Sequence, residues 1–287
     1  MKQKKFDSIF LATFIGIVVL VIGILAIVDN VLGLNINWYG LLIGIAFLVA
    51  IVIIRELAYI KDFEKDIAFD LLLVVFPFAI IGARLFYVAF SGTSWTFLEI
   101  LQVWNGGLSI IGGVIGGFLA LLVYALIKKK NIFAFTDLIV PVLMLGQAIG
   151  RWGNYVNQEV FGQVVTNKHL QWFPFAVFID ATNSWHYALF FYESMLNLIG
   201  AIIIFAIFKK VKKTGYFTSA YLIYYGLIRS IMEVNRYSEF ILQTGNGLPA
   251  SQIVSISFVV LGLALLTYTI ISDIKERKNA QNNNGRV

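Results

Sequence analysis

Charged and amide side chains gather at the end of an apolar segment in FTDLIVPVLMLGQAIGRWGNYVNQEVFG, residues 135–162. Asp137 enters early, and Arg151, Asn154 and Glu159 follow the apolar part. A guanidinium group at lipid depth is costly without a partner, so such a residue is a candidate functional group. A lone arginine would more often be an interfacial anchor, but Arg151 has polar neighbours. The run predicts a membrane helix that carries polar chemistry at its end.

A second polar cluster lies nearer the C-terminus. Arg229, Glu233 and Arg236 are spaced i, i+4 and i+7, which predicts one helix face, and Tyr225 precedes Arg229 by one turn. Several arginines at lipid depth fit a phosphate-binding site, because the planar guanidinium binds phosphoryl oxygens bidentately and stays protonated. Structural Arg–Glu pairs between helices are the alternative. An enzyme, a transporter and a lipid-binding scaffold are all compatible with this pattern.

The composition indicates a polytopic membrane protein. Of the 287 residues, 59% are hydrophobic and 13% are charged, and the mean hydropathy is +0.83. The chain has no cysteine, so any thiol in its chemistry belongs to a substrate. Its two histidines, His169 and His186, are too few for a histidine-rich metal site. The sequence has no Walker motif, no HExxH motif and no internal repeat of the transporter kind.

Apolar segments predict an all-α, polytopic integral membrane bundle of about eight transmembrane helices. The first segment is interpreted as an anchor rather than a signal peptide, because it is long enough to span and lacks a convincing cleavage site. Residues 1–36 then form an anchor helix and a short outer loop, 37–272 the main membrane domain, and 273–287 a polar, disordered tail. A small head is expected after the fifth helix, at about residues 163–185. The predicted spans are 9–28, 37–54, 67–90, 105–127, one starting at 135, and about 186–208, 216–232 and 251–271.

The distribution of lysine and arginine predicts that both termini are cytoplasmic and that the head is extracytoplasmic. With the N-terminus inside, all but five of the 22 Lys and Arg residues lie in cytoplasmic segments. Four of these five fall within or at the outer end of a predicted span, which separates topological cations from candidate functional ones. The five are Arg84, Arg151, Lys168, Arg229 and Arg236.

The polar runs resemble those of the prolipoprotein diacylglyceryl transferase family. GRWGNYVNQEVFG at 150–162 is similar to the family signature G-R-x-G-N-x-x-N-x-E-x-x-G, and YYGLIRSIMEVNR at 224–236 to its Y-G-x-x-R-x-x-x-E-x-x-R pattern. The resemblance covers about residues 37–272 and leaves the first apolar segment outside. Further similar stretches, in the same order, are NWYGLLI at 37–43, GARLFYV at 82–88, NGGLSIIGGVIGG at 105–117, YES at 192–194 and SQIVS at 251–255.

The resemblance implies transfer of the diacylglyceryl group from phosphatidylglycerol to the lipobox cysteine of a prolipoprotein, forming a thioether and releasing glycerol phosphate. Arginines would stabilise the phosphate leaving group and lower the pKa of the attacking thiol. The implied partners are phosphatidylglycerol, the prolipoprotein signal peptide and membrane lipids. The implied location is the bacterial cell membrane, with no metal or organic cofactor. The alternative is an inactive paralogue, or a phospholipid-binding or transport protein that uses the same arginines.

Individual roles also follow from the resemblance. Arg151 and Arg229 correspond to the family's essential arginines, and we expect Arg151 to bind the lipid phosphate and Arg229 to stabilise the leaving group or the thiolate. Asp137, Glu159 and Glu233 are expected to hold the guanidinium groups in place. The remaining expected substrate-binding residues are Tyr39, Arg84, Asn154, Gly162, Tyr225 and Arg236.

The chain departs from the family pattern at three places. Ile111 stands where the family often has a histidine or tyrosine, and isoleucine cannot accept a proton. Either the mechanism does not need that group or this chain is impaired, and the retained arginines, asparagine and glutamates favour the first explanation. Gln158 replaces a glycine that usually precedes the signature glutamate. Tyr187 follows His186 where proline is usual, which leaves the start of the sixth span open.

Overall fold

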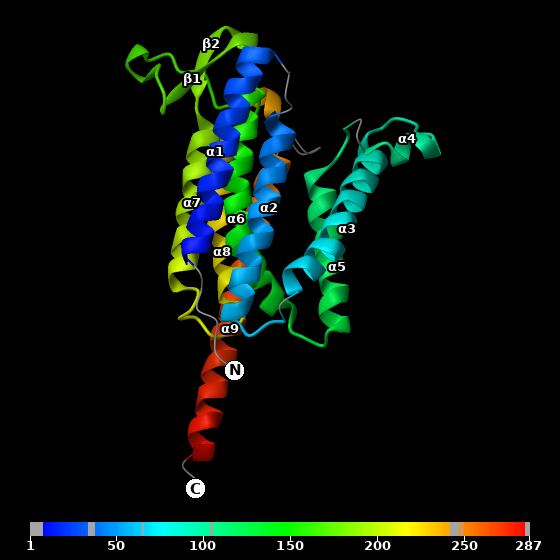
Figure 1. Cartoon of the computed structure of the whole chain (residues 1–287), viewed down its shortest axis with the longest axis vertical. Helices are drawn as coiled ribbons and strands as arrows, with labels where there is room; N and C mark the ends of the chain where they lie inside the picture. Colours follow the sequence, from blue (N-terminus) through cyan, green and yellow to red (C-terminus); the bar gives the residue numbers. More distant parts are fainter. Residues whose placement is uncertain are drawn as a thin grey trace. The chain divides into compact units, whose positions relative to one another are not determined.

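Helices predominate in the computed structural model, which describes residues 8–33, 38–64, 66–103, 106–241, 247 and 249–284 (Figure 1). Within these residues, six helices are long and apolar enough to cross a membrane, so the chain is a polytopic helical membrane protein, as predicted. These are α2 (Trp38–Ile60), α3 (Ile67–Phe90), α5 (Ile110–Ile127), α6 (Ile132–Val156), α7 (Leu189–Ile207) and α9 (Ala250–Asn284). The other α-helices of the described residues are α1 (Ser8–Leu32), α4 (Phe97–Leu101) and α8 (Tyr216–Val234).

The chain divides into two compact units. The small unit contains Ile54–Phe135, and the large unit contains Asp7–Ile53 and Thr136–Val287. Of the lysines assigned to cytoplasmic segments, Lys2, Lys4, Lys5 and Lys65 fall outside the described residues, as do Asn37 and Asn105, where two predicted spans begin, and residues 285–287 of the tail.

Helices α3 and α5 form the core of the small unit through direct backbone contact. A Cβ atom on Gly82 or Gly112 would overlap the backbone of the other helix, and one on Gly116 would overlap the carbonyl of Phe78. Glycine therefore permits this approach. Gly106 and Gly107 have positive φ, which is incompatible with a right-handed helix, so α5 begins at Ile110 rather than at the predicted residue 105.

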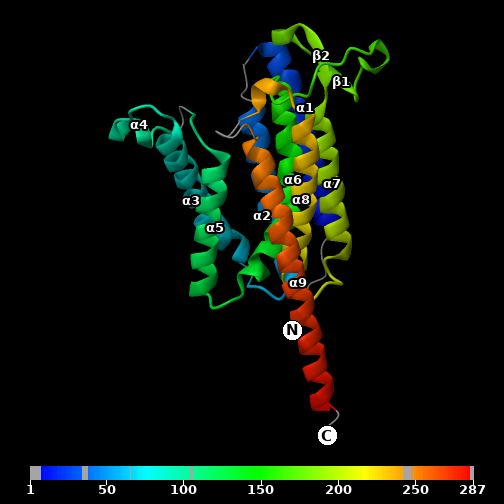
Figure 2. The same cartoon turned by 180° about the vertical axis from the view of Figure 1, so that it is seen from behind.

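The large unit is built on α6, α7 and α8, which lie side by side in both views (Figure 2). Ser194 of α7 donates to the carbonyl of Ala148 in α6 at 2.8 Å, and Tyr224 of α8 donates to the carbonyl of Leu196 in α7 at 2.7 Å. Helix α9 packs closely on α8, where a Cβ atom on Gly226 would overlap the carbonyl of Ser255. These contacts bring the ends of three helices together.

A small head connects α6 to α7. Its antiparallel hairpin pairs β1 (Ala176–Ile179) with β2 (Ser184–Tyr187), and short helices η2 (Lys168–Leu170) and η3 (Asp180–Thr182) flank β1. The all-α prediction therefore needs the addition of one two-stranded sheet. The core of the head consists of Phe161, Val177, Ile179, Ala188 and Phe190.

Two further predicted helix boundaries are wrong. Helix α2 does not stop at Arg55, because its buried positions Ile54, Leu57 and Ala58 continue the apolar face and the helix runs to Ile60. Helix α7 does not start at His186, which lies in β2 with its ring fully buried. The imidazole bonds to the carbonyl of Gly162 and to two hydroxyls of the hairpin, so it is a structural residue of the head.

The predicted disordered tail is also wrong for the residues that the structure describes, since α9 continues to Asn284. The ion pair between Asp273 and Arg277, 2.9 Å long, stabilises the helix. Tyr216 donates to Asp273 at 3.2 Å and Lys213 to Ser272 at 3.0 Å, so the first residue of α8 and the segment before it hold α9 in place.

Candidate active site

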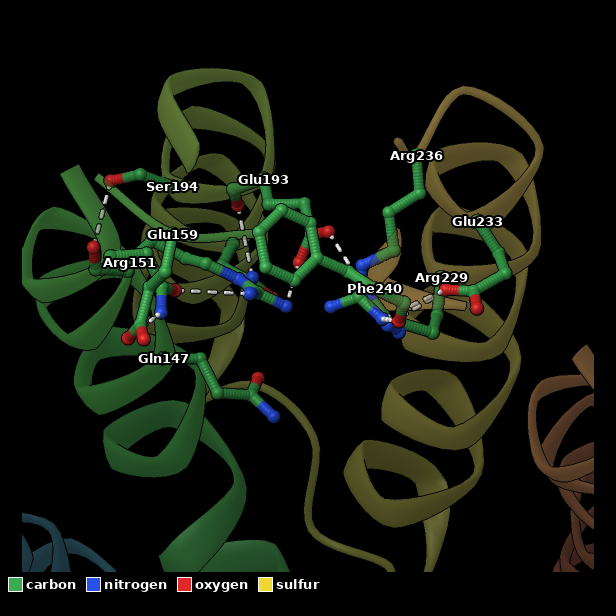
Figure 3. Close-up of polar contacts among 12 residues, drawn as sticks. Gln147, Arg151, Glu159, Glu193, Ser194, Arg229, Glu233, Arg236 and Phe240 are labelled. Atoms are coloured by element: carbon green, nitrogen blue, oxygen red, sulfur yellow. Dashed lines mark hydrogen bonds and ion pairs between the residues drawn. The ribbon is translucent and has the colours of Figure 1, made fainter. Parts of the chain in front are cut away.

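An ion-pair cluster joins α6, α7 and α8 (Figure 3). Glu193 of α7 pairs with Arg151 of α6 and with Arg229 of α8, whose Nη1 lies 2.9 Å from Oε1 of Glu193. Nη2 of Arg229 lies 2.8 Å from Oε2 of Glu233, and the same oxygen accepts from Nη1 of Arg236 at 3.3 Å. Three guanidinium groups and two carboxylates thus alternate along one continuous chain, which we call the arginine cluster.

Backbone pairing places the third arginine of this cluster. Helix α8 ends at Val234, so Arg236 lies just beyond the helix and not on the predicted i+7 position of its face. Gly162 and Arg236 instead form an antiparallel bridge, with hydrogen bonds of 3.0 Å from the amide of Gln163 to the carbonyl of Asn235 and 3.2 Å from Tyr237 to Phe161. The end of the signature run therefore holds Arg236 next to Glu233.

The arginine cluster is largely buried and carries an excess of positive charge. The side chains of Glu193 and Glu233 are 3% and 1% exposed, and the arginines are between 12% and 19% exposed. Burial, and then the nearby Arg229, lower the pKa of Arg236 to about 10. Because this pKa is still well above 7, Arg236 is protonated at neutral pH. Three cations and two anions leave one net positive charge in a site of low dielectric.

Asn154 links Arg151 to Glu159. Nη1 of Arg151 donates to Oδ1 of Asn154 at 3.2 Å, and Nδ2 of Asn154 donates to Oε1 of Glu159 at 3.0 Å. Helix α6 continues through Asn154, so Arg151 and Asn154 are neighbours on one helix face. Glu159 orients the amide of Asn154, and it reaches Arg151 through that amide.

Asp137 lies at the opposite end of α6 from Arg151, about 21 Å away at 1.5 Å per residue. Its carboxylate accepts from the amide of Gly215 at 2.7 Å and from the amide and hydroxyl of Thr218 at 2.8 and 2.6 Å. The carboxylate of Asp137 accepts hydrogen bonds from backbone amides at the N-terminus of α8, and its negative charge interacts favourably with the dipole of that helix. The expectation that Asp137 holds an arginine is therefore wrong, and Glu193 occupies that place.

Arg84 belongs to the small unit, where backbone carbonyls surround its guanidinium. Nε donates to Ile100 at 2.9 Å, Nη1 to Gly106 and Gly107 at 2.8 and 3.0 Å, and Nη2 to Glu99 at 2.5 Å. Four of the five N–H donors of the guanidinium thus bond to carbonyls of α4 and of the loop that precedes α5. The same side chain lines a cavity of about 210 Å³ in the small unit.

Tyr39 and Gly162 each take part in a close contact between a glycine backbone and a tyrosine side chain. A Cβ atom on Gly153 would overlap the ring of Tyr39, so Tyr39 packs against α6 two residues after Arg151. A Cβ atom on Gly162 would lie 2.7 Å from that of Tyr187, and the amide of Gly162 donates to the carbonyl of Tyr187 at 3.0 Å. Tyr39 therefore lies beside the helix that carries Arg151, and Gly162 lies in the bridge that holds Arg236.

Tyr225 lies one turn before Arg229 on α8. Its ring stacks on Tyr221 with centroids 5.5 Å apart, and the hydroxyl of Tyr221 accepts from Gln147 of α6 at 2.9 Å. Gln147 itself precedes Arg151 by one turn and points toward the space between α6 and α8 (Figure 3). The polar layer therefore continues one turn below the arginines.

Glu193 is the main residue that the sequence reasoning missed. It belongs to YES at 192–194, and it is the single charged residue of α7. A carboxylate in an otherwise apolar helix is itself a signal of a buried partner, and this signal could have identified it.

Gln158 explains one departure from the family signature. Its φ of +50° favours glycine, which is the residue usual at this position. Its side chain makes two hydrogen bonds to Asp180 of the head. Nε2 of Gln158 donates to Oδ2 of Asp180 at 2.7 Å, and Oε1 of Gln158 accepts from the backbone amide of Asp180 at 2.9 Å. Gln158 therefore ties the signature loop to the hairpin.

Comparison with known proteins identifies the family of the chain. The model of the prolipoprotein diacylglyceryl transferase family matches residues 26–268, a range that starts within α1. The chain is 39% identical over 244 residues to the phosphatidylglycerol–prolipoprotein diacylglyceryl transferase of Streptococcus uberis, covering 80% of this chain and 90% of that protein. It is 33% identical over 251 residues to transferase 1 of the same description from Clostridium perfringens, covering 85% and 94%. The chain belongs to the prolipoprotein diacylglyceryl transferase family.

Proposed function

We propose that this chain transfers the diacylglyceryl group of phosphatidylglycerol to the lipobox cysteine of a prolipoprotein. Family membership and the names of its relatives support the reaction. The observation that carries it to this site is the net charge of the arginine cluster. A phosphodiester has one negative charge, so a bound phosphatidylglycerol headgroup neutralises the cluster. Sites that bind phosphate use arginine forks in this way.

The reaction is a displacement at carbon. The cysteine sulfur attacks the glyceryl carbon that carries the phosphate, the carbon–oxygen bond breaks, and its electron pair leaves with glycerol phosphate. Arg151 binds the phosphate and Arg229 stabilises the leaving oxygen, where negative charge grows. The same cationic field favours the thiolate over the thiol, whose free pKa is about 8.5. One cluster therefore serves both the nucleophile and the leaving group.

The other residues position these arginines. Glu193 and Glu233 hold the guanidinium groups, and Asn154 with Glu159 orients Arg151. Arg236 supplies the third positive charge. In the same proposal, Tyr39, Gly162 and Tyr225 shape the lipid-binding wall, Arg84 holds the loop before α5, and Asp137 joins α6 to α8.

We also propose the arrangement in the membrane. Helices α1 and α8 complete eight spans with the six apolar helices; the arginines and tyrosines of α8 lower its hydropathy. Positively charged loops at Lys128–Lys130 and Lys209–Lys213 then face the cytoplasm, as do both termini. The head and the arginine cluster face outward from the bacterial cell membrane, where a secreted prolipoprotein presents its signal peptide. Residues 1–36 form the anchor, and 37–272 the transferase domain.

A mass assay tests the proposal. Purified protein is incubated with phosphatidylglycerol vesicles and a lipobox peptide, and the peptide is analysed for a diacylglyceryl adduct on cysteine. A peptide with serine in place of the cysteine is the control. Adduct on the cysteine peptide alone supports the transfer. Lipid binding without adduct contradicts it and indicates a phospholipid-binding protein.

A further inference from the structure

Four aromatic side chains are exposed where the head meets α6 and α7. Tyr155 is in the last turn of α6, and Trp172, Phe173 and Phe175 follow η2 in the head. Their exposed fractions lie between 39% and 53%. We call these four residues the aromatic collar. A cluster of exposed aromatic side chains is rare on a surface that faces water, and it indicates an interaction site.

Contacts with the first turn of α7 fix the depth of the collar. The ring of Phe173 lies 5.0 Å from that of Phe191. The carbonyl of Phe175 accepts from the amide of Ala188 and the hydroxyl of Tyr192, both at 3.1 Å. The collar is therefore level with the end of a helix that is long and apolar enough to span the membrane.

The collar also lies above the outward face of α7. At 100° per residue, Ile202 is about 20° and Ile199 about 80° around the helix from Phe191. Both isoleucines are at least half exposed, as expected for side chains that contact lipid. The opposite face, which carries Glu193 and Asn197, is buried. Phe173 therefore continues the lipid-facing surface of α7 onto the head.

We propose that the aromatic collar lies in the interfacial layer of the bilayer and anchors the head there. Aromatic side chains favour this layer, because the rings are apolar while Trp and Tyr also carry a polar group. Lys168 is exposed four residues before Trp172, so its ammonium can reach lipid phosphates. Because Gln158 ties the signature loop to the hairpin, the anchored head holds that loop at a fixed depth. The inference rests on the membrane architecture and not on the transfer reaction.

Single-cysteine variants test the inference cleanly, since the chain has no cysteine of its own. Trp172→Cys and Phe175→Cys are labelled with an environment-sensitive fluorophore in nanodiscs of phosphatidylcholine and phosphatidylglycerol. Nitroxide on carbon 5 of the lipid acyl chain quenches from the membrane, and iodide quenches from water. Ile202→Cys is the control for lipid contact. Ala181→Cys, exposed in η3, is the control for water contact.

The two collar positions should behave like Ile202 and unlike Ala181. We expect nitroxide lipid to reduce their fluorescence roughly twofold or more, while iodide has little effect. Iodide quenching of both positions to the same extent as Ala181 would overturn the inference. Protection from iodide that appears only after a lipobox peptide is added would also overturn it, because the collar would then be a surface for the signal peptide.

Discussion

Glu193 determines how the arginines are arranged. Its buried carboxylate pairs with Arg151 from one helix and Arg229 from another, so two guanidinium groups stand close together despite their mutual repulsion. A buried ion pair adds little net stability over an apolar pair, yet breaking one is costly because an uncompensated charge remains. The role of Glu193 is therefore to keep the arginines assembled and ready for an anion.

Glu193→Gln should lower both stability and activity. The loss of one carboxylate leaves two partly buried arginines without their common partner, which we expect to cost about 3–5 kcal/mol in the free energy of unfolding. Thermal unfolding in detergent and the rate of adduct formation measure the two effects. Glu159→Gln is the matched control, because Glu159 reaches Arg151 through Asn154 and its loss should cost less. Equal effects of the two substitutions would contradict the central role of Glu193.

Gln158 combines backbone strain with two hydrogen bonds, so its replacement by glycine and by alanine should change the stability of the protein differently. Left-handed backbone costs a non-glycine residue roughly 1–2 kcal/mol. Gln158→Gly loses the bonds to Asp180 but relieves the strain, and its melting temperature should stay near that of the parent. Gln158→Ala loses the bonds and keeps the strain, so it should be the least stable of the three. An alanine variant as stable as the glycine variant would refute this explanation.

Among the secondary-structure elements, hydrophobic length gave the best predictions, and contacts between segments distant in the sequence gave the worst. Helix α3 has its predicted bounds, because a long apolar run admits few alternatives in a membrane. The hairpin was not predicted, since its strands have four residues each and depend on pairing across the head. The pairing of Arg229 with Glu233 followed from i, i+4 spacing. Glu193 could not be paired in advance, because helix packing brings it to Arg151.

Glycine spacing determines the packing of α3 against α5, and replacing different glycines of α5 with alanine should change the stability of the small unit differently. At Gly116 a Cβ atom would overlap the backbone carbonyl of Phe78, which cannot move independently of its helix. Gly116→Ala should destabilise the small unit by about 1–3 kcal/mol.

Gly113→Ala is the matched control, because its Cβ atom would lie 3.5 Å from the carbonyl of Ala79, an ordinary contact. Alanine also favours helix over glycine by about 0.8–1.0 kcal/mol, so this variant should be at least as stable as the parent. Hydrogen exchange of α3 and α5 measures both. Equal protection in the two variants would show that backbone contact does not limit the packing.

At the scale of the whole molecule, the proposed reaction requires the head and the lysine-rich loops to lie on opposite sides of the membrane. Ala181→Cys in the head should react with a membrane-impermeant maleimide applied to intact cells. Lys130→Cys, in the loop after α5, should react only after the membrane is permeabilised. Labelling of Lys130→Cys in intact cells would reverse the proposed orientation.

The most direct test of the account is adduct formation by the parent chain and by Arg151→Lys and Arg229→Lys. Lysine keeps the charge but lacks the planar fork that binds phosphoryl oxygens bidentately. Arg277→Lys is the control, because its side chain is 76% exposed and pairs with Asp273 in α9.

We predict that the parent chain, with Ile111 in place, forms the adduct and that each cluster variant loses about 10²–10³ in kcat/KM. The Arg277→Lys variant should match the parent. Cluster variants with parental kcat/KM would contradict bidentate phosphate binding, and a parent chain that forms no adduct would contradict the transfer itself.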